Sequence, residues 1–159
     1  MSSTQLLNPS TANVGECIAY NVDKQIKQRW KRIRAYELDD PSCAPSFSKG
    51  LAAEVGWDAD FTQLAIDEYK KFTLLSSLFP ESMVPSIHVD TVWHWHLLFT
   101  KSYQKFCREA LGQDFLHHQP GSGDEAENKL YRDLYKDTLA KYEELFGIPP
   151  ASIWGQKSE

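Results

Sequence analysis

Apolar residues recur every three or four positions along most of this sequence, and proline or glycine interrupts the pattern at intervals. The clearest case runs from Phe61 to Leu78 and is stopped by Pro80. This spacing lines up apolar side chains on one face of an α-helix, whereas a half-buried strand needs strict alternation. Proline cannot continue a helix, because it lacks the backbone N–H. The pattern therefore predicts a long amphipathic helix over residues 61–78.

Three further segments show helical spacing. They cover residues 14–39, residues 89–111, and a stretch that opens at Gly123 or Asp124 and ends before the next glycine. Glycine after the last two segments is typical of a helix C-terminus. A shorter helix is expected over 48–55, and no segment alternates as a strand would. The sequence predicts an all-α fold, a compact bundle of four main helices with a short extra helix and a histidine-rich loop.

Domain organisation follows from length and composition. Residues 1–13 are rich in Ser, Thr and Asn, which predicts a flexible N-terminal tail. The chain has 159 residues, of which 42% are hydrophobic, enough for one core. We therefore expect a single all-α domain over 14–159. Ile153 and Trp154, which follow the last predicted helix, are expected to dock on the bundle.

Charge and cysteine usage exclude some classes of protein. The net charge of −5 is a poor match to the phosphates of nucleic acids, so a nucleic-acid partner is not expected. The sequence has no apolar stretch of the roughly 20 residues that a membrane span requires. The N-terminus lacks the pattern of a signal peptide, and the three cysteines form no CxxC pair. We expect a cytoplasmic protein with reduced thiols.

The five histidines are unusually placed, since all lie between His88 and His118. Imidazole is the commonest metal ligand in proteins. Asp90 and His94 are four residues apart, so on a helix they share a face about one turn from each other. That spacing suits a carboxylate and an imidazole that bind one ion, or an aspartate that orients the histidine ring. The window predicts a site for a divalent metal.

His94 and His96 are expected to have different roles. Two residues on a helix are about 200° apart around the axis, so both rings cannot bind one small ion if the helix is regular. His117 and His118 lie in the loop after the third predicted helix. An extended run of five or six residues can return about 18 Å along that helix, which brings one of this pair back to its middle.

Two ligand sets follow from this geometry. One consists of Asp90, His94 and either His117 or His118, with water at an open position. The other consists of His96, one residue of the same pair, and Tyr103 or Cys107 as a further partner. Tyr103 is the candidate catalytic residue, as a proton donor or anion stabiliser.

The ligand types favour zinc or iron, and either a hydrolytic or an oxidative enzyme that acts on a small-molecule substrate. The alternative is a non-catalytic module that binds a protein or peptide. In that case the histidines form a structural hydrogen-bond network.

The same window resembles the glycine-rich domain-containing protein-like family, whose bacterial members are short and whose plant members carry a Trp-His-x-His core within larger proteins. The matching residues are Pro85-Ser86, Val89-Asp90, Val92-Trp93-His94, His96-Leu97-Leu98, Thr100, Tyr103, Cys107, Gly112, His117-His118 and Pro120. The resemblance links plant members to RNA binding and development through extra regions. For this chain it implies one shared motif, made up of Asp90, Trp93, His94, His96, Tyr103 and Cys107.

Overall fold

The computed structural model of the chain describes residues 18–19, 22–119, 121 and 123–155. Within these ranges it contains helices and no strand, so the predicted all-α class is confirmed. The elements in chain order are α1 (Lys24–Ala35), α2 (Phe47–Val55), α3 (Ala59–Leu78), α4 (Ile87–Leu98), α5 (Thr100–Phe106), a π-helical turn η1 (Cys107–Leu111), α6 (Glu125–Phe146) and α7 (Ala151–Trp154).

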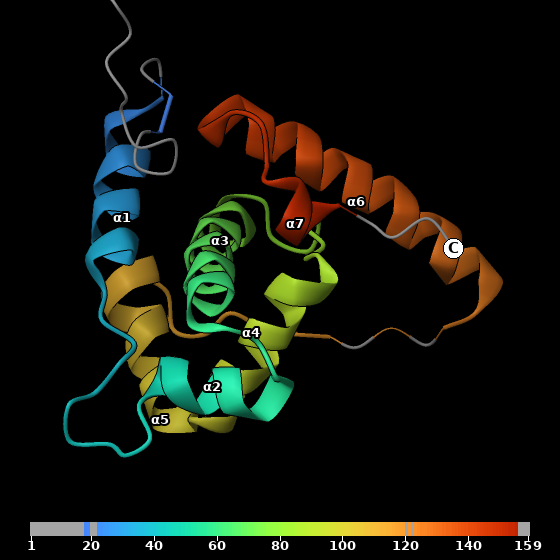
Figure 1. Cartoon of the computed structure of the whole chain (residues 1–159). Coiled ribbons are helices and arrows are strands. Elements are labelled where there is room, and N and C mark those ends of the chain that lie inside the picture. The colour runs from blue at the N-terminus through green and yellow to red at the C-terminus, as the bar shows by residue number, and fades with distance from the viewer. Residues whose placement is uncertain (1–17, 20–21, 120, 122, 156–159) are drawn as a thin grey trace, which may run out of the picture.

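Helix α3 lies at the centre of the arrangement and contacts α1, α2, α4, α6 and α7 (Figure 1). It begins where the carboxylate of Asp58 accepts a hydrogen bond from the backbone N–H of Phe61, and it ends before Pro80. Ala65, Tyr69 and Phe72 are among its fully buried residues. The apolar stripe predicted for this segment therefore packs on all its neighbours and forms the middle of the core.

The first helix is shorter than expected. The prediction over 14–39 was wrong at both ends, because α1 begins at Lys24 and ends at Ala35. Asp23 caps it by accepting a hydrogen bond from Gln25 N at 2.7 Å. The N–H of Ala19 instead donates to the carbonyl of Leu145, at the end of α6, at 2.8 Å. This pairing with another helix is incompatible with Ala19 as a residue of α1. The predicted tail over 1–13 lies outside the described residues.

The segment predicted as one helix over 89–111 is divided. It ends as α4 at Leu98 and resumes as α5 at Thr100, with Phe99 between them at φ −94° and ψ 66°. No proline or glycine marks this position, so no local signal predicts the break. The Phe99 ring packs near Phe47 and Trp95, with centroid distances of 6.0 and 5.4 Å. The break turns α5 away from the axis of α4.

The C-terminal elements largely follow the prediction. Helix α6 begins after Asp124 and stops before Gly147, whose φ of 83° suits glycine. Ile153 and Trp154 of α7 are buried, which confirms that this end docks on the bundle. Leu130, in the first turns of α6, is exposed. No helix among the described residues is long and apolar enough to cross a membrane.

A buried polar network joins α3, α6 and α7. The Glu68 carboxylate pairs with the Lys71 ammonium at 2.7 Å and accepts hydrogen bonds from the Tyr142 hydroxyl at 2.7 Å and the Trp154 indole at 2.8 Å. Lys71 also donates to the Tyr142 hydroxyl at 3.1 Å. All four residues are buried, and we call them the core network. It fastens α7 to the central helix.

Candidate metal centre

The first two residues of the site lie on α4. Ser86 begins this helix by accepting a hydrogen bond from Val89 N at 3.2 Å, and this cap fixes the register of the turns that follow. Asp90 and His94 are one turn apart on one side, with 3.7 Å between Asp90 Oδ2 and His94 Nδ1. This is the arrangement expected from their spacing.

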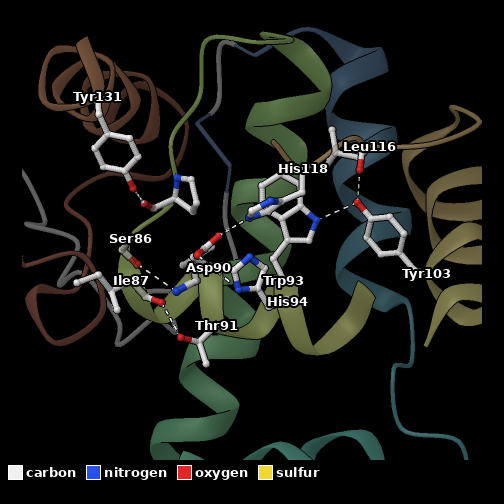
Figure 2. A network of polar contacts seen from close by, with 12 residues as sticks. Ser86, Ile87, Asp90, Thr91, Trp93, His94, Tyr103, Leu116, His118 and Tyr131 are labelled. Atoms are coloured by element: carbon white, nitrogen blue, oxygen red, sulfur yellow. Dashed lines mark hydrogen bonds and ion pairs between the residues drawn. The ribbon is translucent and has the colours of Figure 1, made fainter. Parts of the chain in front are cut away.

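His118 completes the group from the loop that follows η1. Its Nε2 lies 2.6 Å from Asp90 Oδ1, and its ring centroid lies 4.4 Å from that of His94 (Figure 2). One ligand atom from each of the three side chains falls within 4.8 Å of the other two. We call Asp90, His94 and His118 the triad. Sequence reasoning left His117 and His118 as alternatives, and the structure brings His118 into this group.

The triad is open to solvent on one side. The side chains of His94, Asp90 and His118 are 57%, 32% and 13% exposed, respectively. Ile87 and Leu98, at 78% and 73%, are also exposed. Both lie within one narrow stripe of α4 with His94, because seven and four residues bring a helix back to nearly the same side. The open side of the triad thus carries an imidazole flanked by two large apolar side chains.

Two imidazoles and one carboxylate suit a transition metal such as zinc or iron. Ligands about 2.0–2.2 Å from one ion lie about 3–4 Å from each other. The 2.6 Å contact between Asp90 and His118 is shorter, as expected for a hydrogen bond with a proton between them. A bound ion would take the place of that proton and would require these two groups to separate slightly.

His96 lies apart from the triad, in the core. Its ring is fully buried among aromatic rings, with centroid distances of 5.0 Å to Tyr103 and 5.4 Å to Phe47. Its Nδ1 hydrogen-bonds with the Tyr69 hydroxyl at 2.9 Å, and its Nε2 has no partner. Burial lowers the pKa of His96 to about 4, so the ring is neutral at pH 7. His94 and His96 thus lie in different environments, and their different roles stay a prediction.

His117 and Tyr103 also lie outside the triad. His117 is exposed, and its ring lies 5.0 Å from that of Phe115. Tyr103 is buried, and its hydroxyl accepts a hydrogen bond from the Trp93 indole at 2.9 Å and donates to the carbonyl of Leu116. Burial is the largest cause that raises the pKa of Tyr103, so it keeps its proton.

Tyr131 of α6 is a neighbour that sequence reasoning missed. Its hydroxyl donates to the carbonyl of Pro85 at 3.2 Å, just before the helix that carries Asp90 (Figure 2). Burial, and then the nearby charge of Asp90, raise the pKa of this phenol. Tyr131 follows Asp90 by 41 residues and belongs to another helix, so no local spacing links them.

Fold and site together define an all-helical protein with a candidate metal centre of two histidines and one aspartate. The chain belongs to the UCP032817-like family, whose model matches residues 28–135 and so includes the whole triad. The resemblance to glycine-rich domain-containing proteins is confirmed by two relatives.

Both relatives come from Arabidopsis thaliana. Glycine-rich domain-containing protein 2 is 30% identical over 109 residues, which is 65% of this chain and 14% of that protein. Glycine-rich domain-containing protein 1 is 32% identical over 92 residues, which is 55% of this chain and 11% of that protein. The chain therefore spans only about a seventh or less of these relatives. No solved structure matches it significantly.

Proposed function

We propose that this protein binds one divalent transition metal, zinc or iron, through Asp90, His94 and His118. The observation that carries the proposal is the convergence of these three side chains, from a helix and a distant loop, to within 4.8 Å. Two histidines and one carboxylate form the protein ligands of open catalytic zinc sites and of non-haem iron sites. His96 and His117, which sequence reasoning also included, are not part of this ligand set.

We extend the proposal to a metal-dependent enzyme that acts on a small molecule. Three protein ligands leave a coordination position for water or substrate, and the exposed side of His94 gives access to it. A bound ion would supply Lewis acidity toward an oxygen atom at that position. Asp90 would contribute one negative charge to the ion, and without an ion its hydrogen bond keeps the ring of His118 close to the site.

Metal analysis of protein purified without an affinity tag tests the proposal. We expect about one equivalent of zinc or iron, with weaker binding in acid because protons compete for the imidazoles. His94→Ala should weaken binding by more than about 100-fold, beyond the loss typical of removing an outer partner. His117→Ala is the matched control, because that side chain is exposed, adjacent to His118 and outside the triad. A wild-type protein that takes up neither metal would overturn the proposal.

A second function, a non-catalytic module that binds a protein or peptide, rests on a different observation. Ile87 and Leu98 are exposed on the stripe of α4 that also carries His94. The hydrogen bond between Asp90 and His118 is complete without an ion. For this function we expect no bound metal and the same unfolding curve with and without chelator.

A further inference from the structure

We infer that Tyr103 is a positioning residue that, together with Trp93, holds the loop after η1 so that His118 meets Asp90 and His94. This inference rests on the proposed function, since it concerns how the metal ligands are brought together. We call the series formed by the Trp93 indole, the Tyr103 hydroxyl and the Leu116 carbonyl the aromatic brace.

The hydrogen bonds of the brace are buried and directional. The Tyr103 hydroxyl accepts from Trp93 Nε1 at 2.9 Å and donates its own proton to the carbonyl of Leu116 (Figure 2). All three residues are buried. A buried polar group that loses its partner is costly, so these bonds fix the carbonyl of Leu116 against α5. His118 follows two residues later, and that length of chain spans at most about 7 Å.

The second contact of the brace is with the His118 ring itself. The Trp93 ring lies 4.4 Å from the His118 ring, centroid to centroid, at an interplanar angle of 71°. Trp93 directly precedes His94 on α4. The Trp93 indole therefore contacts the His118 ring directly, and its N–H donates to the Tyr103 hydroxyl that binds the loop backbone at Leu116. The next residue on the helix is His94.

The break at Phe99 makes the brace possible. On a continuous helix, residues 93 and 103 would lie about 15 Å apart along the axis. With α5 turned away from α4, their side-chain polar atoms lie 2.9 Å apart. The feature that sequence reasoning did not foresee is thus the one that joins the two ligand-bearing segments.

Tyr69 provides a matched control, because its loss shows what happens when a buried tyrosine hydroxyl outside the brace is removed. It is fully buried like Tyr103, and its hydroxyl also hydrogen-bonds with a buried side chain, Nδ1 of His96 at 2.9 Å. It lies on α3, and no hydrogen bond links it to Leu116 or His118 among the described residues. Tyr103→Phe and Tyr69→Phe each remove one buried hydroxyl, and only the first releases the loop.

The experiment compares the unmodified 159-residue chain with these two variants, well below the unfolding temperature of each. Zinc affinity is measured by competition with a chelator, and hydrogen exchange of the segment 113–119 is measured without metal. Tyr103→Phe should weaken zinc binding about tenfold, the scale seen when an outer partner of a metal ligand is removed, and should speed exchange in this segment. Tyr69→Phe should leave both quantities near the wild-type values.

The outcomes separate this inference from the proposed function. If the wild-type protein binds no zinc or iron, the proposed function fails, and faster exchange in Tyr103→Phe alone would still support the brace. If the wild-type protein binds metal but Tyr103→Phe and Tyr69→Phe have equal zinc affinities, the inference fails while the proposed function stands. A double variant with Trp93→Phe should show less than the sum of the two single effects, because both act on one hydroxyl. Full additivity would count against the brace.

Discussion

The triad and the core network both bring together polar side chains from separate segments, but they differ in how far those side chains are exposed to solvent. In the core network, Glu68 accepts hydrogen bonds from three buried donors, and the ammonium of Lys71 is paired inside the protein. In the triad, His94 is 57% exposed and lies 3.7 Å from its nearest carboxylate oxygen. Buried charges must be satisfied by the protein itself. Groups open to water can leave an atom free for a ligand, which is the property a metal centre requires.

The largest effect that we expect contrasts Glu68→Ala with Asp90→Ala in metal-free protein. Loss of the Glu68 carboxylate leaves the Lys71 ammonium buried without a counter-charge and should lower the free energy of unfolding by about 3–5 kcal/mol. Asp90 is partly exposed near the start of α4, so its loss should cost about 1 kcal/mol. Urea unfolding in the presence of chelator measures both.

Metal affinity should show the reverse order. Asp90→Ala removes a proposed ligand, whereas Glu68 lies in another part of the molecule. A milder Glu68→Gln variant keeps an oxygen acceptor and serves if Glu68→Ala does not fold. The contrast between the two regions would be lost if Asp90→Ala destabilised the metal-free protein as much as the Glu68 variants do.

His96 extends the comparison to acid stability. The pKa of this buried histidine is lowered to about 4, so between pH 6.5 and pH 4 the unfolded chain binds a proton that the folded protein excludes. The free energy of unfolding should therefore be highest above about pH 6.5 with respect to this group. It should fall by about 3 kcal/mol in total as the pH falls toward 4. Urea unfolding at a series of pH values measures this slope.

Variants at two histidines of α4 test whether His96 causes this pH dependence of the free energy of unfolding. His96→Gln should remove most of it, while His94→Gln, at an exposed position, should retain it. Ring resonances of His96 followed by NMR in the wild-type protein give the same answer without a substitution. An unchanged slope in His96→Gln would show that other groups control acid unfolding.

The fold was predictable where local signals coincide with packing. The stripe over 61–78 and Pro80 correctly delimit α3, and Gly147 ends α6 as expected. The break at Phe99 could not be predicted from local signals, because no proline or glycine marks it and its ring packs near Phe47 of α2, which is distant in the sequence. Glu68 offered an unused signal, since a carboxylate within an apolar helical stripe needs buried partners.

The candidate site was predictable only in part, for a related reason. Helical spacing alone places Asp90 beside His94. The choice between His117 and His118 depends on the direction in which the loop returns, and the bond from Tyr103 to Leu116 restrains that direction. The Trp93 indole donates to the same Tyr103 hydroxyl across the break at Phe99, so a prediction that assumes one straight helix cannot include this arrangement.

A smaller effect than that of Glu68→Ala is expected when a single donor of the core network is removed. Trp154→Phe keeps an aromatic ring, smaller than the indole, next to Tyr142 and Phe72, and it removes the indole N–H that donates to Glu68 at 2.8 Å. Glu68 retains Lys71 and Tyr142 as partners, so unfolding should become easier by about 1–2 kcal/mol rather than by the full cost of an unpaired charge.

Thermal unfolding of metal-free protein measures this change, and zinc affinity should stay within about twofold of the wild-type value, because the donor lies outside the contacts that hold His118. A large drop in zinc affinity would mean that α7 and the triad are coupled, and the closed and open regions could then no longer be treated as independent. Helix α7 contacts α4, the helix that carries Asp90 and His94, so a change at Trp154 could reach the triad. The zinc measurement therefore tests whether the two regions are independent.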